Sequence, residues 1–413
     1  MTIAAIIAEY NPFHNGHDYM LKKVKEETGA DYVIAVMSGN FTQRGIPGIT
    51  DKFIRAKMAV SCGVDAVFEL PVRFATASAE QFAAGSVALF DAFSCVDYLA
   101  FGSECGSLSE FSNAIELLLH EPEAFQISIQ KHLRQGNSYP KAFSLAIKEC
   151  DIAASVSGEL LEHPNNLLGL EYMKALKMLA SSIKPHTITR TGTGYHDTHT
   201  SFSTESGTMI ASASAIRSAL TSQTDSIVLA RPLLPAESYR IFAESYGISA
   251  PVSLNDFSLL LSTRIATETK ESLASFLDVS KELADRIYRF RDEFMPFDKL
   301  ISSIKHKQYT YARINRALVH ILLGLKERVT PPLVPYARLL AMKKTSSPLM
   351  KELKEHTRIP IITKPSDARK CLDADALTMF LEDVAAADLY NRIVSSKFGT
   401  PFLTDMRHSI ELV

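Results

Sequence analysis

Short apolar runs alternate with amphipathic segments along the first hundred residues. The runs end in polar turns and cover Ile3 to Ala8, Tyr32 to Met37, Ala66 to Leu70 and Val96 to Phe101. Between them, apolar residues recur at helical spacing in His14 to Thr28, Asp51 to Cys62 and Ser78 to Ala92. Buried strands separated by helices predict an α/β fold with a doubly wound parallel sheet. Such sheets bind their ligands at the carboxyl ends of the strands.

The remainder of the chain is mostly helical in pattern. Residues 108–181 show helical spacing, residues 187–189 predict one more strand, and Ala211 to Leu220 predicts a short helix. Prolines between Arg231 and Pro235 mark a boundary, so we expect a sheet domain, 1–225, and a mostly helical domain, 226–413. In the second domain the clearest helical segments are Phe257 to Thr267, Lys281 to Arg291, Tyr309 to Leu325 and Ala374 to Ser396, with a short strand near 358–362.

The composition is that of a globular protein, with 46% hydrophobic and 22% charged residues. No window approaches the about 18 uninterrupted apolar residues of a membrane span, and only Met1 and Thr2 precede the first apolar run. We therefore expect a cytoplasmic protein without a signal peptide. The five cysteines include no Cys-x-x-Cys pair, so neither a disulfide framework nor a zinc site is indicated.

The net charge of −2 hides an asymmetry between the two halves of the chain. Residues 1–225 hold 17 Lys and Arg against 24 Asp and Glu, whereas residues 226–413 hold 27 against 22. The strongest bias lies between Lys305 and Lys370, with 15 basic and 4 acidic residues. A solvated basic face is the simplest explanation. The asymmetry nevertheless favours a polyanionic partner for the second half.

Two histidines stand three residues apart in the turn after the first predicted strand, in His14-Asn15-Gly16-His17. At the start of a helix, free N–H groups and the positive end of the dipole attract an anion, and Gly16 would let a phosphate or base approach the backbone. Two imidazoles there can donate hydrogen bonds to an α-phosphate as charge develops. An arbitrary His-x-x-His would be two incidental surface residues, but a preceding strand and a following helix favour a nucleotide site.

A second segment has the same chemistry. Ser212, Ser214 and Arg217 are spaced to place hydroxyls at the start of a helix and a guanidinium one turn later. In this order, the two segments resemble the signatures of the nucleotidyltransferase superfamily that includes small adenylyltransferases and class I aminoacyl-tRNA synthetases. We therefore expect His14, His17 and Arg217 to be the catalytic residues.

The resemblance narrows when further segments are included. Residues 8–17, 37–45, 68–71, 101–104, 164–169 and 309–316 together resemble the bacterial tRNA(Met) cytidine acetate ligase family over essentially the whole chain. This resemblance implies that ATP activates acetate as acetyl-adenylate and that the acetyl group then passes to N4 of the wobble cytidine of elongator tRNA(Met). Mg²⁺ would accompany ATP and bridge its phosphates.

The resemblance also suggests which residues hold ATP. Residues 7–20 would form the loop under the nucleotide, Gly102 would leave room for it, an Asn would bond ribose or base, and Arg190 would pair with phosphate. The expected ATP-binding residues are Ile7, Ala8, Glu9, Tyr10, Asn11, Pro12, Phe13, Asn15, Gly16, Met20, Gly102, Asn165, Asn166, Arg190, Ser212 and Ser214. An Asn pair that caps the next helix and a surface Arg are the alternatives for Asn165, Asn166 and Arg190.

Further polar residues are candidates for substrate or tRNA contacts. Gln43 and Arg44 follow the second strand and could bind acetate, ATP or tRNA. In the basic half, unpaired anticodon-loop bases could stack on aromatic residues between cations. The expected residues there are Lys305, Lys307, Tyr309, Arg313 and Arg316. His196, Asp197 and His199 lack a fourth ligand, so we expect no metal site.

Two other functions remain as alternatives. An adenylyltransferase that acts on a small phosphorylated metabolite would use the same site but would leave the basic half without a substrate. An RNA-binding protein with an inactive nucleotide site is disfavoured by the intact His14, Gly16, His17 and Arg217. No protein partner is evident from the sequence.

Overall fold

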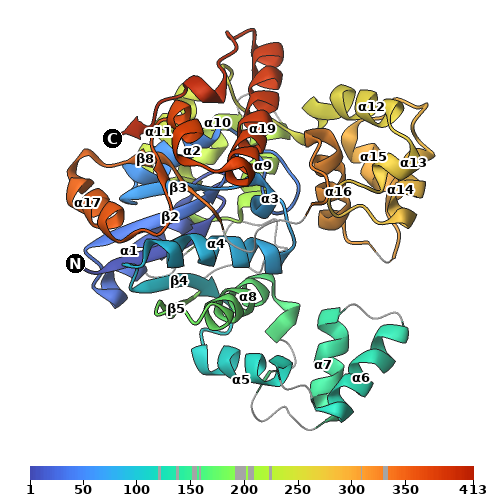
Figure 1. Ribbon diagram of the computed structural model, residues 1–413, viewed down its shortest axis with the longest axis horizontal. Helices are drawn as coiled ribbons and strands as arrows, with labels where there is room; N and C mark the ends of the chain where they lie inside the picture. The colour runs from blue at the N-terminus through green and yellow to red at the C-terminus, as the bar shows by residue number, and fades with distance from the viewer. Residues whose placement is uncertain are drawn as a thin grey trace.

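A mostly parallel β-sheet with helices on both faces forms the centre of the molecule (Figure 1). The computed structural model describes residues 1–119, 122–135, 139–150, 156–157, 160–190, 201–202, 209–222, 226–307, 309–328 and 334–413. The strands are β1 (Ile3–Ala8), β2 (Tyr32–Ser38), β3 (Ala66–Leu70), β4 (Tyr98–Ser103), β5 (Lys184–Thr189), β8 (Ala337–Met342), β9 (Ile361–Ile362) and β10 (Glu411–Leu412). Their order is β10-β8-β3-β2-β1-β4-β5, with β9 beside β8. Strands β1 to β5 run parallel, as expected from the sequence.

Helices bury both faces of the sheet. One face carries α1 (Asn15–Thr28), α2 (Lys52–Ser61), α9 (Ala213–Ser222) and α11 (Ala236–Ser245), and the other carries α4 (Ala79–Phe93), α8 (Pro164–Met178), α17 (Ser347–His356) and α19 (Ala374–Phe398). Successive strand residues point to opposite faces, so Ile34 and Val36 join one core whereas Val33 and Ala35 join the other. This explains why the strands read as continuous apolar runs.

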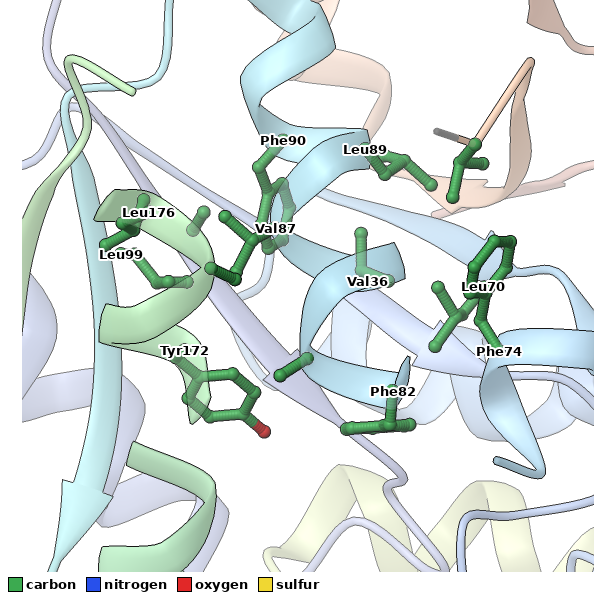
Figure 2. Packing of buried hydrophobic residues seen from close by; sticks show 14 of the residues in the cluster. Val36, Leu70, Phe74, Phe82, Val87, Leu89, Phe90, Leu99, Tyr172 and Leu176 are labelled. Carbon is green, nitrogen blue, oxygen red and sulfur yellow. The ribbon is translucent and has the colours of Figure 1, made fainter. Parts of the chain in front are cut away.

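Helix α4 forms the centre of one core. Figure 2 shows Val87 and Phe90 of α4 between Leu99 of β4 and Leu176 of α8 on one side and Leu70 of β3 on the other. All five side chains are buried. Burial of side chains of this size contributes roughly 1.5–3 kcal/mol each, which fixes the sheet and therefore its carboxyl edge.

The division at residue 225 is wrong as a boundary between a sheet domain and a helical domain. Strand β8 pairs antiparallel with β3, and β9 and β10 pair with β8, so residues 334–413 complete the sheet. The sequence obscured β8 because Arg338 interrupts its apolar run. The structure neutralises this buried guanidinium with Asp405 at 2.5 Å and Glu69 at 3.4 Å, and Lys52 contacts the same two carboxylates at 3.1 and 2.8 Å. Only distant parts of the chain make this burial possible.

Residues 254–328 form a helical module that lies beside the sheet (Figure 1). It consists of η3 (Leu254–Phe257), α12 (Ser258–Thr267), α13 (Lys270–Leu273), α14 (Lys281–Tyr288), α15 (Phe297–Ile304) and α16 (Tyr311–Leu323). Phe41, from the loop after β2, enters its core with its ring 5.5 Å from that of Phe257. The loop after β2 therefore joins the module to the sheet.

The remaining elements are shorter or peripheral. Helices α5 (Leu108–Leu119), α6 (Glu123–Arg134) and α7 (Tyr139–Glu149) project beyond α8 (Figure 1). The others are α3 (Val72–Ala75), η1 (Leu160–Glu162), β6 (Ser201–Phe202), β7 (Met209–Ile210), α10 (Ser226–Ala230), η2 (Arg231–Leu233), η4 (Lys344–Ser346), η5 (Pro365–Asp367), α18 (Ala368–Cys371) and η6 (Asp405–Arg407). Within the described ranges, no helix has the length and apolar character needed to cross a membrane.

Candidate active site

The two histidines after β1 cap helix α1 with their side chains. Nδ1 of His14 accepts a hydrogen bond from the Gly16 N–H at 3.1 Å, and Nδ1 of His17 accepts one from the His14 N–H at 3.2 Å. This is a capping box in which two imidazoles replace the usual hydroxyl and carboxyl groups. Because each Nδ1 is an acceptor, the proton of each neutral ring must lie on Nε2.

Both rings are neutral in the folded protein. They stack with centroids 3.7 Å apart, and burial together with the nearby Arg190 and Arg217 lowers the pKa of His14 to about 3. Burial, His14 and Arg190 also lower the pKa of His17. Neither Nε2 has a hydrogen-bond partner within the described part of the chain. The loop therefore presents two neutral N–H donors that do not titrate near pH 7.

Gly16 makes room for the ring that caps the helix. A Cβ at this position would lie 3.0 Å from Cε1 of His14, so glycine is needed for the capping imidazole to lie over the backbone. The glycine therefore makes room for the His14 ring itself.

The loop before the histidines is built from buried residues. Tyr10 and Phe13 are 2% and 0% exposed, and their rings lie 5.0 and 5.5 Å from that of His17. Asn11 uses its side chain to accept from the Ile49 N–H at 2.7 Å. These side chains hold the loop in shape, and the contact of residues 7–20 with the nucleotide stays a prediction.

Helix α9 brings the second motif to the first. Arg217 donates to the Asn11 carbonyl at 2.9 Å and to the Ser214 hydroxyl at 3.1 Å. Ser212 accepts from the Ala215 N–H at 3.1 Å, which caps α9 as predicted. Burial lowers the pKa of Arg217 to about 10, so the guanidinium is still charged at neutral pH. A positive charge therefore lies next to the histidine loop.

Arg190 reaches the same place from the end of β5. Its side chain lies over Gly102, where a Cβ would be 3.3 Å from Cγ of Arg190 and 3.8 Å from the Met20 sulfur. Glu104 raises the pKa of Arg190, although burial lowers it more. The sequence had placed the nucleotide against Gly102, but the described neighbours of this glycine are Arg190 and Met20.

The two asparagines at the start of α8 hold the turn that follows β4. Asn166 is 2% exposed and accepts from the N–H groups of Glu104 and Cys105 at 2.8 and 3.1 Å. Asn165 donates to Glu104 at 2.5 Å. Asn15 likewise donates within the protein, to the carbonyls of Met209 and Pro232 at 2.8 and 2.9 Å. The amide oxygen of Asn166 and the amide nitrogen of Asn15 are thus engaged within the fold, and contact of either residue with the nucleotide stays a prediction.

The loop after β2 connects this site to the helical module. The Gln43 N–H donates to the Glu9 carboxylate at 3.0 Å, and Glu9 and Arg44 each influence the pKa of Arg217. Gly45 adopts φ +66° and lies against α16, where a Cβ would come within 2.5 Å of the Asn315 carbonyl carbon. Gln43 and Arg44 therefore lie between the arginines of the site and α16.

Comparison with known proteins identifies the family of this chain. Residues 1–400 match the family model described as HIGH Nucleotidyl Transferase. The chain is 38% identical over 393 residues to the tRNA(Met) cytidine acetate ligase of Thermoanaerobacter sp. (strain X514), covering 94% of this chain and 95% of that one. It is 37% identical over 399 residues to the protein of the same name from Acetivibrio thermocellus, covering 94% of each. The chain belongs to this family.

A solved structure supports the assignment. The crystal structure of Thermotoga maritima TmcAL bound with alpha-thio ATP matches with a TM-score of 0.87 and 28% identity, and the match covers 100% of both chains. The apo form of the same protein matches with a TM-score of 0.88. The family resemblance and the α/β fold expected from the motifs are confirmed.

The residues expected to meet RNA differ in exposure. Lys305, Lys307 and Arg313 are exposed or half-buried. Tyr309 is 5% exposed and its hydroxyl lies 3.0 Å from Ser280, while Arg316 is 9% exposed and paired with Asp278 at 2.9 Å. Tyr309 and Arg316 therefore stabilise the module, and their burial argues against the predicted contact with RNA. His196, Asp197 and His199 lie outside the described residues.

Sequence analysis missed Arg55, which holds the site loops together. This fully buried guanidinium donates to the carbonyls of Glu9 at 2.6 Å, Ser38 at 3.2 Å and Thr50 at 3.2 Å, and also to that of Gly39. It thereby links the ends of β1 and β2. The sequence does contain a signal for Arg55, because it lies on the apolar face of the predicted helix, and a cation on such a face must have polar partners.

Proposed function

We propose that this protein activates acetate with ATP and transfers the acetyl group to N4 of the wobble cytidine of elongator tRNA(Met). The observation that carries the proposal is the pair of neutral imidazoles that carry their proton on Nε2, close enough to the arginines for Arg190 and Arg217 to lower the pKa of His14, in a chain similar over nearly its full length to ligases of that name. Two fixed donors and two guanidinium groups suit a substrate whose phosphates gain charge during displacement.

In the first step, an acetate oxygen attacks the α-phosphorus of ATP and the bond to pyrophosphate breaks. His14 and His17 donate Nε2–H to the oxygens that gain charge, and Arg217 and Arg190 neutralise the phosphates. Since both imidazoles are neutral at pH 7, they act as hydrogen-bond donors and do not transfer protons. Their stacking and capping contacts fix both rings before ATP arrives.

In the second step, the cytidine amine attacks the acetyl carbon of acetyl-adenylate, the bond from that carbon to the phosphate oxygen breaks, AMP leaves, and the proton lost by the amine passes to solvent. This amine is weakly nucleophilic because its lone pair is delocalised into the ring, which explains why a mixed anhydride is required. Placing the base next to the anhydride supplies most of the acceleration in this scheme.

Magnesium fits this site as a companion of ATP. Among the described residues, the nearby carboxylates of Glu9 and Glu104 already accept hydrogen bonds from Gln43 and from Asn165 and Asn166. Because these carboxylates are already engaged, a Mg²⁺ ion would be held mainly by the phosphate oxygens of ATP. The ion would neutralise phosphate charge.

The test is to incubate the protein with ATP, Mg²⁺, labelled acetate and tRNA that lacks the modification, and to digest the RNA for nucleoside mass spectrometry. We expect label in N4-acetylcytidine of elongator tRNA(Met). Formation of AMP and pyrophosphate without labelled RNA would support adenylation with another acceptor. Absence of acetate-dependent ATP cleavage would contradict the proposal as a whole.

A further inference from the structure

The first residue of α16 is an aromatic ring that the mechanism has not used. Tyr311 is 58% exposed, and the Lys305 ammonium lies 5.3 Å from its centroid. Thr310 caps the helix by accepting from the Arg313 N–H at 3.3 Å, which fixes the backbone at this position. The ring is therefore held at the surface next to a cation.

The neighbouring Tyr309 shows the contrast. It is 5% exposed, against 58% for Tyr311, and its hydroxyl lies near Ser280 and Glu282. A buried ring whose hydroxyl is already bonded can stack on nothing outside the protein. Of Tyr309 and Tyr311, only Tyr311 is exposed for a ligand.

The helix that carries Tyr311 is connected to the active site through the loop after β2. Four residues further along α16, about 6 Å along the helix axis, Asn315 is in direct contact with Gly45. Arg44 immediately precedes Gly45 in that loop, and its charge lowers the pKa of Arg217. The loop that meets α16 one turn from Tyr311 therefore also carries a charge that acts on the active site.

We propose that Tyr311 stacks on an unpaired base adjacent to the target cytidine, with Lys305 beside it facing the RNA backbone. Stacking on an aromatic face is available to any base, and the nearby cations Lys305 and Lys307 suit a phosphate chain. The inference rests on the proposed function, because it assumes that the RNA approaches the site along α16.

The test compares Tyr311→Ala, Tyr311→Phe and Phe294→Ala. Phe294 is a matched control because it is an aromatic residue of the same module and is 65% exposed. Alanine is a better helix former than tyrosine, so the substitution at 311 preserves α16. Two activities are measured: acetate-dependent ATP–pyrophosphate exchange, which needs no RNA, and acetylation of an unmodified elongator tRNA(Met) transcript.

We expect Tyr311→Ala to raise the KM for tRNA about ten-fold, within the range for losing one base stack, and to leave the exchange reaction unchanged. Tyr311→Phe and Phe294→Ala should stay within about two-fold of wild type. An unchanged KM in Tyr311→Ala, or an equal loss in Tyr311→Phe, would overturn the inference.

Direct binding of the same transcript separates this inference from the proposed function. Tyr311→Ala should weaken binding but keep the salt dependence, whereas Lys305→Ala should lower the slope of log K against log salt by about one. If wild type binds the transcript without acetylating it, the proposed function fails while the stack is still tested. If wild type does not bind the transcript, the inference fails as well.

Discussion

Replacement of His17 can separate its two hydrogen bonds. In His17→Asn, the amide oxygen takes the place of Nδ1 and can still accept from the His14 N–H, but no donor replaces Nε2–H. In His17→Gln, the amide nitrogen lies near the position of Nε2, but the acceptor at the Nδ1 position is lost. The two variants therefore separate the role of His17 in capping α1 from its proposed role as a hydrogen-bond donor to ATP.

The structure sets the expected magnitudes. Losing a single donor to the transition state costs roughly 10²- to 10³-fold in rate. Losing a helix-capping acceptor costs about 1 kcal/mol of stability. We thus expect His17→Asn to unfold near the wild-type temperature but to lose about 10²-fold or more in acetate-dependent ATP–pyrophosphate exchange. His17→Gln should unfold at lower temperature and retain more exchange activity than His17→Asn.

The assays are thermal unfolding followed by circular dichroism and exchange of labelled pyrophosphate into ATP. The reasoning would be refuted if His17→Asn kept wild-type exchange, since Nε2–H would then have no role in the transition state. It would also be refuted if His17→Asn were destabilised as strongly as His17→Gln. His17→Ala serves as the control that removes both bonds.

Three further predictions concern pH, the loop after β2 and the buried ion pairs. The pKa of His14 is about 3 in the folded protein against 6.5 for an exposed imidazole, so the unfolded chain takes up protons first as the pH falls. The free energy of unfolding, measured with urea, should therefore decline from about pH 6.5 toward 3. Replacement of both histidines should make this decline shallower without removing it, because His320, with a pKa of about 4, and Asp405, with a lowered pKa, contribute in the same range; an unchanged slope would contradict the assignment. Gly45→Ala should displace the loop from α16 and weaken both ATP–pyrophosphate exchange and tRNA acetylation. Gly29→Ala is the control, because Gly29 has a similar positive φ but no atom within 4 Å of a Cβ, and it should lower stability alone. Equal activity in the two variants would contradict a link between this loop and the active site. Lys52→Met should lower the free energy of unfolding by roughly 3–5 kcal/mol, because the Glu69 and Asp405 carboxylates would be left with Arg338 alone. A loss below about 1 kcal/mol in a urea titration would show that this network does not hold β8 in the sheet.

The arrangement of the site also explains the attachment of the helical module. Glu9 lies at the end of β1 and accepts from the Gln43 N–H, while Gly45 of the same loop contacts α16. Arg55 anchors the carbonyls at both ends of this connection. A single loop thus joins the arginines proposed to bind phosphate to the surface proposed for RNA.

Local sequence patterns determined much of this protein. The alternation of apolar runs and amphipathic segments predicted β1 to β4 and their helices, since one strand or helix shows its periodicity within a few residues. The spacing of His14 and His17 and of Ser212 and Arg217 likewise predicted two helix starts that meet at one site. The motifs also indicated the family.

Tertiary structure alone decided which side chains are available. Strand β8 forms because Arg338 meets Glu69 and Asp405, residues far away in the chain whose carboxylates offset the cost of burying its charge. The same kind of distant contact buries Tyr309 and leaves Tyr311 exposed, although the two are neighbours in a basic segment. Periodicity reports which face of an element is apolar, but only the complete set of partners determines whether a polar or aromatic group on that element faces solvent or the core.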